Sequence, residues 1–385
     1  MTAQTIKFLG GAIAVMVVGV LLFSGEDNTT NPDRGRKVFP ELMSKINDVK
    51  EIVVSANSGT ATMSRDGETW VVKEKSGYPA DMGKVRELLI GLGELEIIEA
   101  KTKNPELYDK LGLQDVTEEG SLSNGVTIKG EGGVTLAEAV IGTRRPAKGD
   151  SSLDELYYRH PGHPQTWLAI GNLKIEPIPG EWVNKTIYEV ETKRVKAVQI
   201  THPDGTIVEL EKDQPDDSDY HVVNLPKKSK IQSQFTVNNM VSTLAVLRLD
   251  DVKSAKDLSS KGKKVVTAVF ETFDGLEGTV KIWKDGEQHY ITASTVFNPT
   301  LIWKHQPKEA KKSKAPTKAD DSKTENESDE KDESVPEKPT IKPAVEVNAE
   351  VEAINKKVEG WVYAIPKFRA ETILKKPKDL IQKPS

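Results

Sequence analysis

Two hydrophobic periods alternate along the chain, and each predicts a different kind of element. After residue 48, apolar residues recur at every second position in the runs 49–56, 60–64 and 68–75, which is typical of strands with one buried face. Turn signals at 57–59 and 65–67 separate these runs and predict a three-stranded meander. The period then changes to three and four and predicts an amphipathic helix, with Asp81 as its N-cap and with these apolar residues: Met82, Val85, Leu88, Leu89, Leu92 and Leu95.

The second half of the chain repeats this order of elements. Residues 194–200 match residues 48–54, and a helix-spaced apolar stripe follows again at Phe235, Val237, Val241, Leu244 and Leu247. Strand-like runs close both halves, at 125–130, 136–142, 155–160 and 166–170 in the first and at 265–273, 278–283 and 289–294 in the second. A shared order with local identities indicates duplication. The predicted fold is therefore α+β and antiparallel β-rich, with tandem repeats at 48–190 and 191–385, each a β-meander plus one amphipathic helix.

A charged segment at about 306–345 interrupts the second repeat. It consists almost wholly of Lys, Glu, Asp, Ser, Thr and Pro, so it cannot bury enough apolar surface to offset the entropy of ordering. Its mixed charges favour a disordered, solvated spacer over a binding tail. Residues 361–381 after it resemble the end of the first repeat, with Trp361 in the place of Trp167, so we interpret the segment as an insertion.

The amino-terminal region predicts a membrane anchor. Residues 8–23 contain no charged side chain and, with their neighbours, approach the roughly 20 residues that a bilayer core requires. We therefore assign residues 1–27 to a transmembrane helix and residues 28–47 to a linker with a short helix after Pro40. A cleaved signal peptide or a buried soluble helix are the alternatives. Basic residues flank both sides of the segment, so the flanking charges do not favour export of the body. We still place the body outside, because large domains translocate largely regardless of flanking charge.

Composition and motifs do not indicate an enzyme. The chain has no cysteine, which excludes disulfides and thiol chemistry, and its net charge of −5 does not favour a nucleic-acid partner. His160 and His163 have a metal-like spacing, but the Pro and Gly between them more simply make a turn. The acidic run 214–219 can be a calcium loop or a solvated loop. We expect the six tryptophans to fill the core rather than to stack a ligand, and we expect no cofactor.

Three sequence boxes carry a resemblance to a known family. Trp70 ends a strand, Tyr78, Pro79, Ala80 and Asp81 lead into the helix, and a box of Tyr108, Leu111, Gly112 and Leu113 follows. With the ending around Trp361, these boxes resemble the bacterial domain-of-unknown-function family 4340 over about residues 38–381, outside the insertion. Two residues separate Tyr108 from Leu111 where the family box is tighter, and the second repeat has no clear Tyr-Pro-Ala-Asp turn. The boxes make sense as structure, because Pro79 fixes a turn, Asp81 caps a helix and Gly112 permits a bend.

The resemblance implies a membrane segment and the company of ABC-type transport components, with no established activity. We therefore expect a non-enzymatic accessory or scaffolding protein of the bacterial inner membrane, with a single span and its large carboxy-terminal domain in the periplasm. The alternative is a periplasmic module that binds a glycan or a lipid in a cleft between the repeats. An envelope hydrolase is a third hypothesis, and it requires a cluster of titratable residues in a cleft.

Overall fold

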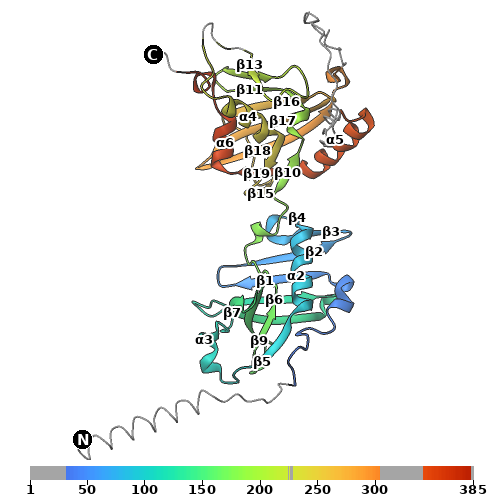
Figure 1. The fold of residues 1–385 in the computed structure, drawn as a ribbon, viewed down its shortest axis with the longest axis vertical. Helices are drawn as coiled ribbons and strands as arrows, with labels where there is room; N and C mark the ends of the chain where they lie inside the picture. Colours follow the sequence, from blue (N-terminus) through green and yellow to red (C-terminus); the bar gives the residue numbers. More distant parts are fainter. Residues whose placement is uncertain (1–31, 224, 226–228, 304–340, 383–385) are drawn as a thin grey trace, which may run out of the picture. The chain divides into compact units, whose positions relative to one another are not determined.

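The computed structural model describes residues 32–223, 225, 229–303 and 341–382, and the chain forms two compact units (Figure 1). The first unit is Met1–Val183 and the second is Asn184–Ser385, whereas the sequence placed the boundary between residues 190 and 191. The apolar segment 8–23 lies outside the described residues. Among the residues that the structure describes, no helix has both the length and the apolar character needed to cross a bilayer.

The first unit contains one antiparallel sheet of nine strands in the order β4-β3-β2-β1-β6-β7-β8-β9-β5. Alternate residues of β1, β2 and β6 point to a buried face, as the period of two predicts. The strands are β1 (Glu51–Ala56), β2 (Gly59–Asp66), β3 (Thr69–Val72), β4 (Tyr78–Pro79), β5 (Glu96–Ala100), β6 (Asn124–Lys129), β7 (Thr135–Ala147), β8 (Asp150–Arg159) and β9 (Thr166–Gly171).

One helix, α2 (Met82–Glu94), covers the buried face of this sheet (Figure 1). The carboxylate of Asp81 accepts hydrogen bonds from the backbone N–H groups of Gly83 (2.9 Å) and Lys84 (3.3 Å), which confirms Asp81 as the N-cap. The apolar stripe is buried from Val85 to Leu95, with Leu88 at 0% exposure, whereas Met82 at the start of the helix is 42% exposed. The short helix expected after Pro40 is the 3-10 helix η1 (Met43–Asp48), and the short helix α3 (Tyr108–Leu111) precedes β6.

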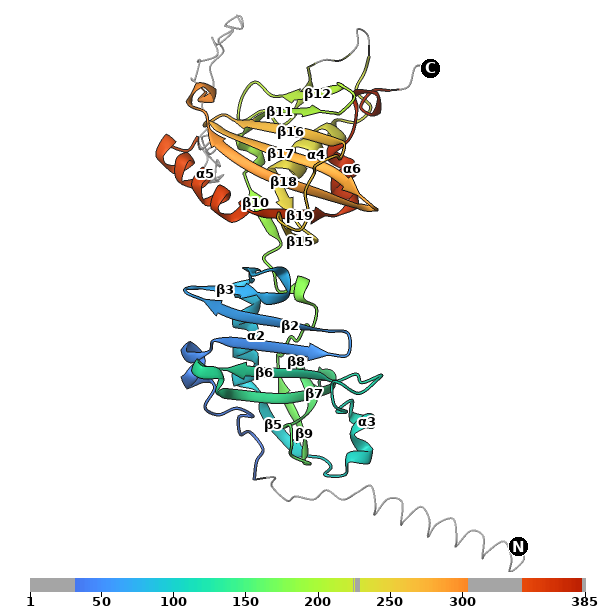
Figure 2. The same cartoon turned by 180° about the vertical axis from the view of Figure 1, so that it is seen from behind.

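The second unit contains an eight-stranded antiparallel sheet in the order β13-β12-β11-β16-β17-β18-β19-β15. Its strands are β11 (Val195–Thr201), β12 (Ile207–Glu211), β13 (His221–Val222), β15 (Asp251–Ser254), β16 (Val265–Thr272), β17 (Leu276–Asp285), β18 (Gln288–Phe297) and β19 (Trp361–Ile365). A separate two-stranded sheet joins β10 (Thr186–Glu189) to β14 (Val246–Arg248). The helices are α4 (Gln234–Ala245), α5 (Ala344–Val358) and α6 (Lys367–Ile373), and Figure 2 shows the strands in front of α4 and α6.

The two large sheets have one strand order. Without β4, the first reads β3-β2-β1-β6-β7-β8-β9-β5, and the second has the equivalent strands β13-β12-β11-β16-β17-β18-β19-β15 in the same positions. The helix also follows four strands in both units, because α2 comes after β4 and α4 comes after β13. The chain is therefore an antiparallel, β-rich α+β protein, as its periodicity predicted.

Residues 304–340 fall between β18 and β19, where the first unit has only the short β8–β9 connection. This segment, which the sequence predicts to be disordered, lies outside the described residues. The segment was expected to end at about residue 345, and the helix α5 begins at Ala344. This helix forms because Val347, Val351, Ile354 and Val358 recur at spacings of four and three, and all four are buried.

Candidate functional site

The residues from Trp70 to Asp81 fasten the amino-terminal end of α2 to the edge of the first sheet. Tyr78 and Pro79 form the edge strand β4, where a proline is tolerated because one side needs no donor. The Ala80 N–H donates to the Trp70 carbonyl (2.7 Å), and the Asp81 N–H donates to the Trp182 carbonyl (2.7 Å). Trp70, Tyr78 and Ala80 are buried. In the structure these residues position a helix and bring no reactive group together.

The box from Tyr108 to Leu113 is held on the first sheet by a buried arginine, Arg159. The Arg159 Nε donates to the Leu113 carbonyl (2.9 Å), its Nη2 pairs with Asp115, and its guanidinium lies 5.1 Å from the centre of the Tyr108 ring. Gly112 has a φ of +65°, and a Cβ there would lie 2.9 Å from Thr143 Oγ1. Leu111 is half-buried and Leu113 is fully buried. The bend expected at Gly112 is therefore a left-handed helix end that also needs space.

The tryptophans divide into two groups. Trp70, Trp182 and Trp283 are buried, as expected for core residues, whereas Trp167, Trp303 and Trp361 are half-buried. Trp361 pairs with Ser254 on β15, and Trp167 pairs with Ala100 on β5. Since β15 and β5 are the last strands of the two sheets, Trp361 and Trp167 occupy equivalent positions in the two units.

The described residues form no set of metal ligands at His160 and His163 or at the acidic run 214–219. The rings of His160 and His163 are 6.4 Å apart, and His160 packs edge-on against Tyr158 and Phe39. His160 Nδ1 lies 3.1 Å from the Glu138 carbonyl, so it is engaged by the backbone. In the described part of the chain, no group of three or more His, Asp or Glu side chains is arranged to hold a metal ion.

The acidic loop at 214–219 encloses a lysine of this chain. The Lys212 ammonium donates to the carbonyls of Pro215 (3.0 Å) and Asp217 (3.4 Å) and lies 5.2 Å from the Tyr220 ring. Burial lowers the pKa of Lys212, while nearby Asp217 and Asp216 oppose that change. The carbonyls that a calcium ion would use therefore already face a cation.

A buried ion network joins the start of β11 to α5. Arg194 Nε donates to Asp274 Oδ2 (2.7 Å), and Arg194 Nη1 donates to Glu350 Oε1 (2.9 Å). Lys342 Nζ also pairs with Glu350 (3.0 Å). Burial raises the pKa of Glu350, but the hydrogen bonds from Arg194 and Lys342 outweigh it and leave that pKa below its ordinary value.

Trp303 and Lys342, which flank residues 304–340 on either side, both contact the hairpin turn between β16 and β17. The Trp303 N–H donates to the Phe273 carbonyl (2.7 Å), and the Trp303 and Phe273 rings pack edge-on. The Lys342 N–H donates to Asp274 Oδ2 (3.4 Å). Arg194 therefore supports the turn from which this segment leaves and to which it returns. The sequence gives no sign of this role, because Arg194 and Glu350 are 156 positions apart.

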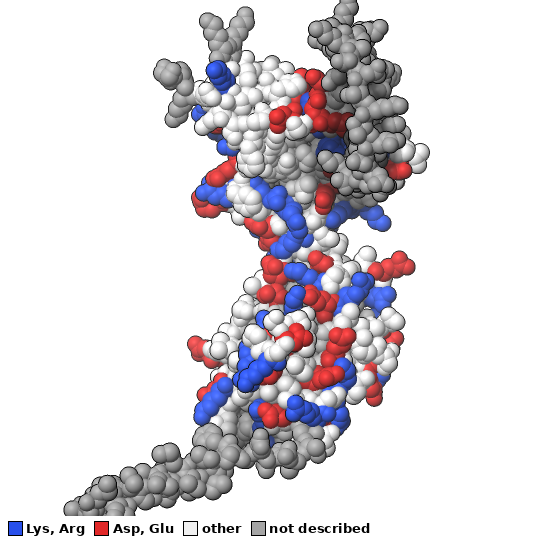
Figure 3. Space-filling model, viewed as in Figure 1, with Lys and Arg blue, Asp and Glu red and all other residues white. Residues whose placement is uncertain are grey.

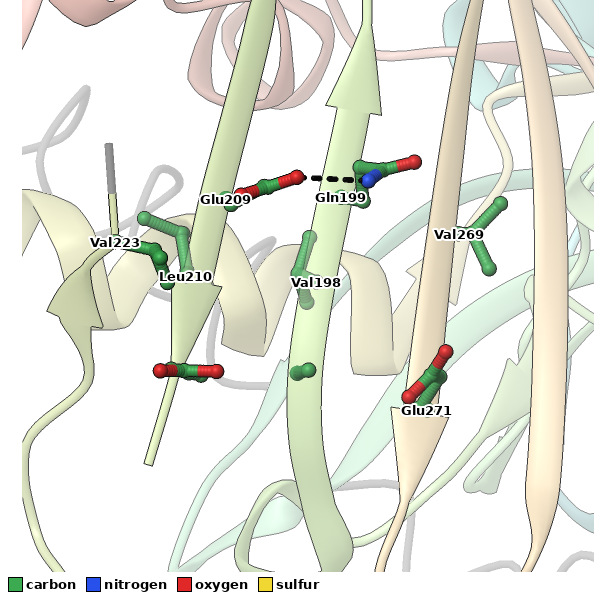
Figure 4. A pocket seen from close by; sticks show the side chains of 9 residues that line it. Val198, Gln199, Glu209, Leu210, Val223, Val269 and Glu271 are labelled. Carbon is green, nitrogen blue, oxygen red and sulfur yellow. Dashed lines mark hydrogen bonds between the residues drawn. The ribbon is translucent and has the colours of Figure 1, made fainter. Parts of the chain in front are cut away.

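The face of the second sheet opposite α4 carries a shallow groove of about 330 Å³ (Figure 4). Side chains from three neighbouring strands line it, and Gln199 Nε2 donates to Glu209 Oε1 (2.9 Å) across two of them. Val269 and Glu271 project from β16, and Val223 borders the groove with 44% of its surface exposed. The groove therefore mixes carboxylate and aliphatic surface on strands that pair with one another.

The strand register concentrates carboxylates at one end of this face. Ala197 pairs with both Glu211 and Glu271, and Glu271 pairs directly with Glu277. Burial raises the pKa of Glu271, and the neighbouring charge of Glu277 raises it further. We name this surface, made of Gln199, Glu209, Glu211, Val223, Val269, Glu271 and Glu277, the open sheet face. Like charges on paired positions are unfavourable, so a cationic partner would relieve them.

The charged side chains on the visible faces are otherwise mixed in sign. Figure 3 shows Lys and Arg next to Asp and Glu over the first unit, with no broad basic area on that side. In the first unit Lys73 is paired with Glu51 (2.5 Å), and Arg145 is paired with Glu155 (2.7 Å). Such pairs are solvated surface and contribute little to stability.

Comparison with known proteins assigns the chain to a family. Residues 70–264 match the family described as Domain of unknown function (DUF4340). No curated protein matches the chain, and no solved structure does. The matched range begins at Trp70 and includes the turn at Tyr78 and the box at Gly112. Since it spans just over half of the 385 residues, the protein belongs to the DUF4340 family.

Proposed function

We propose that this protein is a non-enzymatic accessory or scaffolding protein of the cell envelope that docks a partner on the open sheet face of its second unit. The partner is an envelope protein, and a component of an ABC-type transport assembly is the candidate that the family resemblance supplies. The observation that carries the proposal is the open sheet face itself. It combines exposed Val223 and half-buried Val269 with carboxylates on a hydrogen-bonded sheet, a mixture suited to a non-obligate protein interface.

The anchor belongs to the same proposal. The apolar segment 8–23 supports one span in the bacterial inner membrane, with the two units in the periplasm. A duplicated origin for the units is supported by their common strand order. In this arrangement a single helix holds two copies of one module near the membrane, and we propose no nucleic-acid partner.

The chemistry of the face defines the kind of partner. Glu211, Glu271 and Glu277 lie in one row across paired strands, and Val269 and Gln199 lie in the next row. A segment that presents lysine or arginine beside aliphatic side chains complements both rows. Charge complementarity of this kind sets the association rate and the choice of partner.

Site-specific photo-crosslinking in cells tests the docking. A photoreactive phenylalanine analogue at position 199 is expected to capture one envelope protein, and the Glu271→Lys variant is expected to lose that product. The matched control carries the analogue at position 235, because Phe235 is 77% exposed on α4, on the other side of the sheet. Equal products from positions 199 and 235, or no product from position 199, would refute docking on this face.

The location of the body is tested separately. A carboxy-terminal reporter that is active only in the periplasm is expected to be active, and replacing residues 8–23 with a polar linker is expected to abolish that activity. A reporter active only in the cytoplasm would overturn the proposed orientation and would leave the docking test unaffected.

A further inference from the structure

A second groove, of about 400 Å³, lies in the first unit between α2, η1 and the β2–β3 hairpin. Eight of its twelve lining residues are apolar, and Trp70 is among them. Met43 and Met82 line it with 44% and 42% of their surfaces exposed. Met43 also packs on Gly93, where an added Cβ would collide with its side chain. Exposed methionines beside a tryptophan form an adaptable apolar surface.

The groove follows one side of α2. Met82, Val85, Arg86, Leu89 and Ile90 line it, at positions i, i+3, i+4, i+7 and i+8 of the helix. Val85 and Leu89 are buried against the sheet, whereas Met82 is exposed and Ile90 is half-buried. The apolar stripe of α2 therefore extends beyond the residues that the sheet buries.

The second unit provides an internal comparison. Counted from the N-caps Asp81 and Ser233, the positions of Met82, Arg86 and Ile90 are taken in α4 by Gln234, Asn238 and Ser242. Positions that pack on the sheet stay apolar in both helices, as Val85 and Val237 illustrate. Met82 and Ile90, on the side of the helix that lines the groove, have polar residues in their places in α4.

In α4, Gln234 and Asn238 bind the chain segment around Tyr220. The Tyr220 N–H donates to Asn238 Oδ1 (3.1 Å), and Asn238 Nδ2 donates to Asp219 Oδ1 (2.8 Å). Gln234 Nε2 donates to the Tyr220 carbonyl (2.6 Å). In the second unit the chain's own backbone closes this side of the helix. Met82 and Ile90 in the first unit can form no such bonds.

Two arginines at the groove bring positive charge to its rim. Arg65 Nη1 donates to the Asn47 carbonyl and Arg65 Nε donates to the Gly67 carbonyl, both at 3.3 Å. Arg86 is exposed, and within the described ranges neither arginine has a carboxylate in an ion pair. Glu68 is the one acidic residue in the lining. An apolar trough with guanidinium groups at its rim suits a ligand with an apolar body and an anionic end.

We propose that this groove binds the acyl chain of a single-chain anionic lipid, with Arg86 and Arg65 at its head group. The stripe from Met82 to Ile90 is about 12 Å long at 1.5 Å per residue. A stable protein interface buries about 800 Å² on each partner, which a trough of this length does not supply. One acyl chain of medium length matches its length and its lining. The inference goes beyond partner docking and places a lipid site within one unit rather than between the repeats.

Photo-labelling of the full chain tests the site. The chain is reconstituted in nanodiscs of zwitterionic lipid and labelled with a decanoic acid that carries a diazirine near its methyl end, and the labelled peptides are mapped by mass spectrometry. Labelling is expected on the peptides of α2 and η1, and Met82→Gln with Ile90→Ser, the residues found in α4, is expected to lower it about tenfold. Phe235→Gln is the matched control, and it should leave that labelling unchanged. Label on residues 8–23 reports on the proposed anchor instead, so the two proposals fail separately.

Affinity measurements separate a lipid site from a general apolar surface. Each methylene added to the acid is expected to tighten binding about fourfold until the groove is filled. Arg86→Gln should weaken the acid two- to fivefold and leave the matching alcohol unchanged. Both variants change surface side chains, and an unaltered thermal transition verifies their folding. Labelling of α2 that the double substitution does not reduce, no dependence on chain length, or stronger competition by an acidic amphipathic peptide than by the acid would overturn the proposal.

Discussion

The Arg194 network offers a quantitative test of how the second unit is held together. Arg194→Met removes the guanidinium and keeps most of the aliphatic volume. The Arg194 side chain is 3% exposed and that of Asp274 is 1% exposed, so the substitution leaves a buried carboxylate without a cation. Breaking a buried pair in this way costs about 3–5 kcal/mol. The Thr272 hydroxyl still donates to Asp274 Oδ1 (2.6 Å), which favours the lower part of that range.

Two companion variants make the prediction specific. Glu350→Gln removes the half-buried partner but leaves Arg194 paired with Asp274, so we expect a loss of about 1–2 kcal/mol. Adding Asp274→Asn to Arg194→Met removes the orphaned charge, so the double variant should be more stable than Arg194→Met alone. The coupling should fall within about 0.5–3 kcal/mol, as is usual for residues in one network.

Thermal unfolding followed by hydrogen exchange and mass spectrometry measures each unit by its own peptides. For a unit of roughly 200 residues, 3–5 kcal/mol corresponds to a fall of about 6–20 °C in the midpoint. The fall should occur in the peptides of β16, β17 and α5, while peptides of the first unit serve as the internal control. A midpoint of the second unit within about 2 °C of the parent would refute the assignment of Arg194 as a stabilising residue.

Three further predictions concern other parts of the chain. Gly112→Ala should destabilise the first unit by about 1–3 kcal/mol in urea unfolding, because alanine at φ +65° is strained and its Cβ meets Thr143. The pKa of Glu350 lies below its ordinary value of 4.5, so its contribution to stability is complete above that pH and is lost as the pH falls through the lowered value; an acid titration of the Glu350→Gln variant should lack this component. Replacing residues 304–340 with a quarter-length Gly-Ser linker should stabilise the second unit by about 1.2 kcal/mol in the same urea assay, provided that the segment is the solvated spacer its composition predicts.

Local chemistry explains what could be predicted from the sequence. The N-cap at Asp81 and the bend at Gly112 depend on a few neighbouring residues, and both are present as expected. The buried stripe of α2 follows directly from its spacing. The edge strands β5 and β15 were not predicted, because each pairs with a strand that is distant in sequence. The helix α5 was missed where its apolar residues adjoin the charged segment.

The candidate sites were harder to predict because they depend on long-range register. Glu271 and Glu277 face each other across one hairpin, but Glu211 joins their row only because β12, β11 and β16 align. The acidic loop shows a further limit of local sequence. The run 214–219 left a calcium loop and a solvated loop as alternatives, and only the structure shows that Lys212, just before it, binds the Pro215 carbonyl.

Two copies of a duplicated module can differ at positions on which the shared sheet and helix do not depend. The shared structure of both units is the sheet and the apolar stripe of one helix. At these positions both copies have buried apolar residues, as Leu92 and Leu244 illustrate. The flank of the helix is free to change: Asn238 ties the chain down in the second unit, whereas Met82 and Ile90 leave an apolar trough in the first. The β8–β9 connection is free as well, and the equivalent place in the second unit accepts the segment 304–340 because Phe273 and Asp274 hold the chain on either side of it. The differences between the copies therefore lie where a ligand or a partner can use them without weakening the common core.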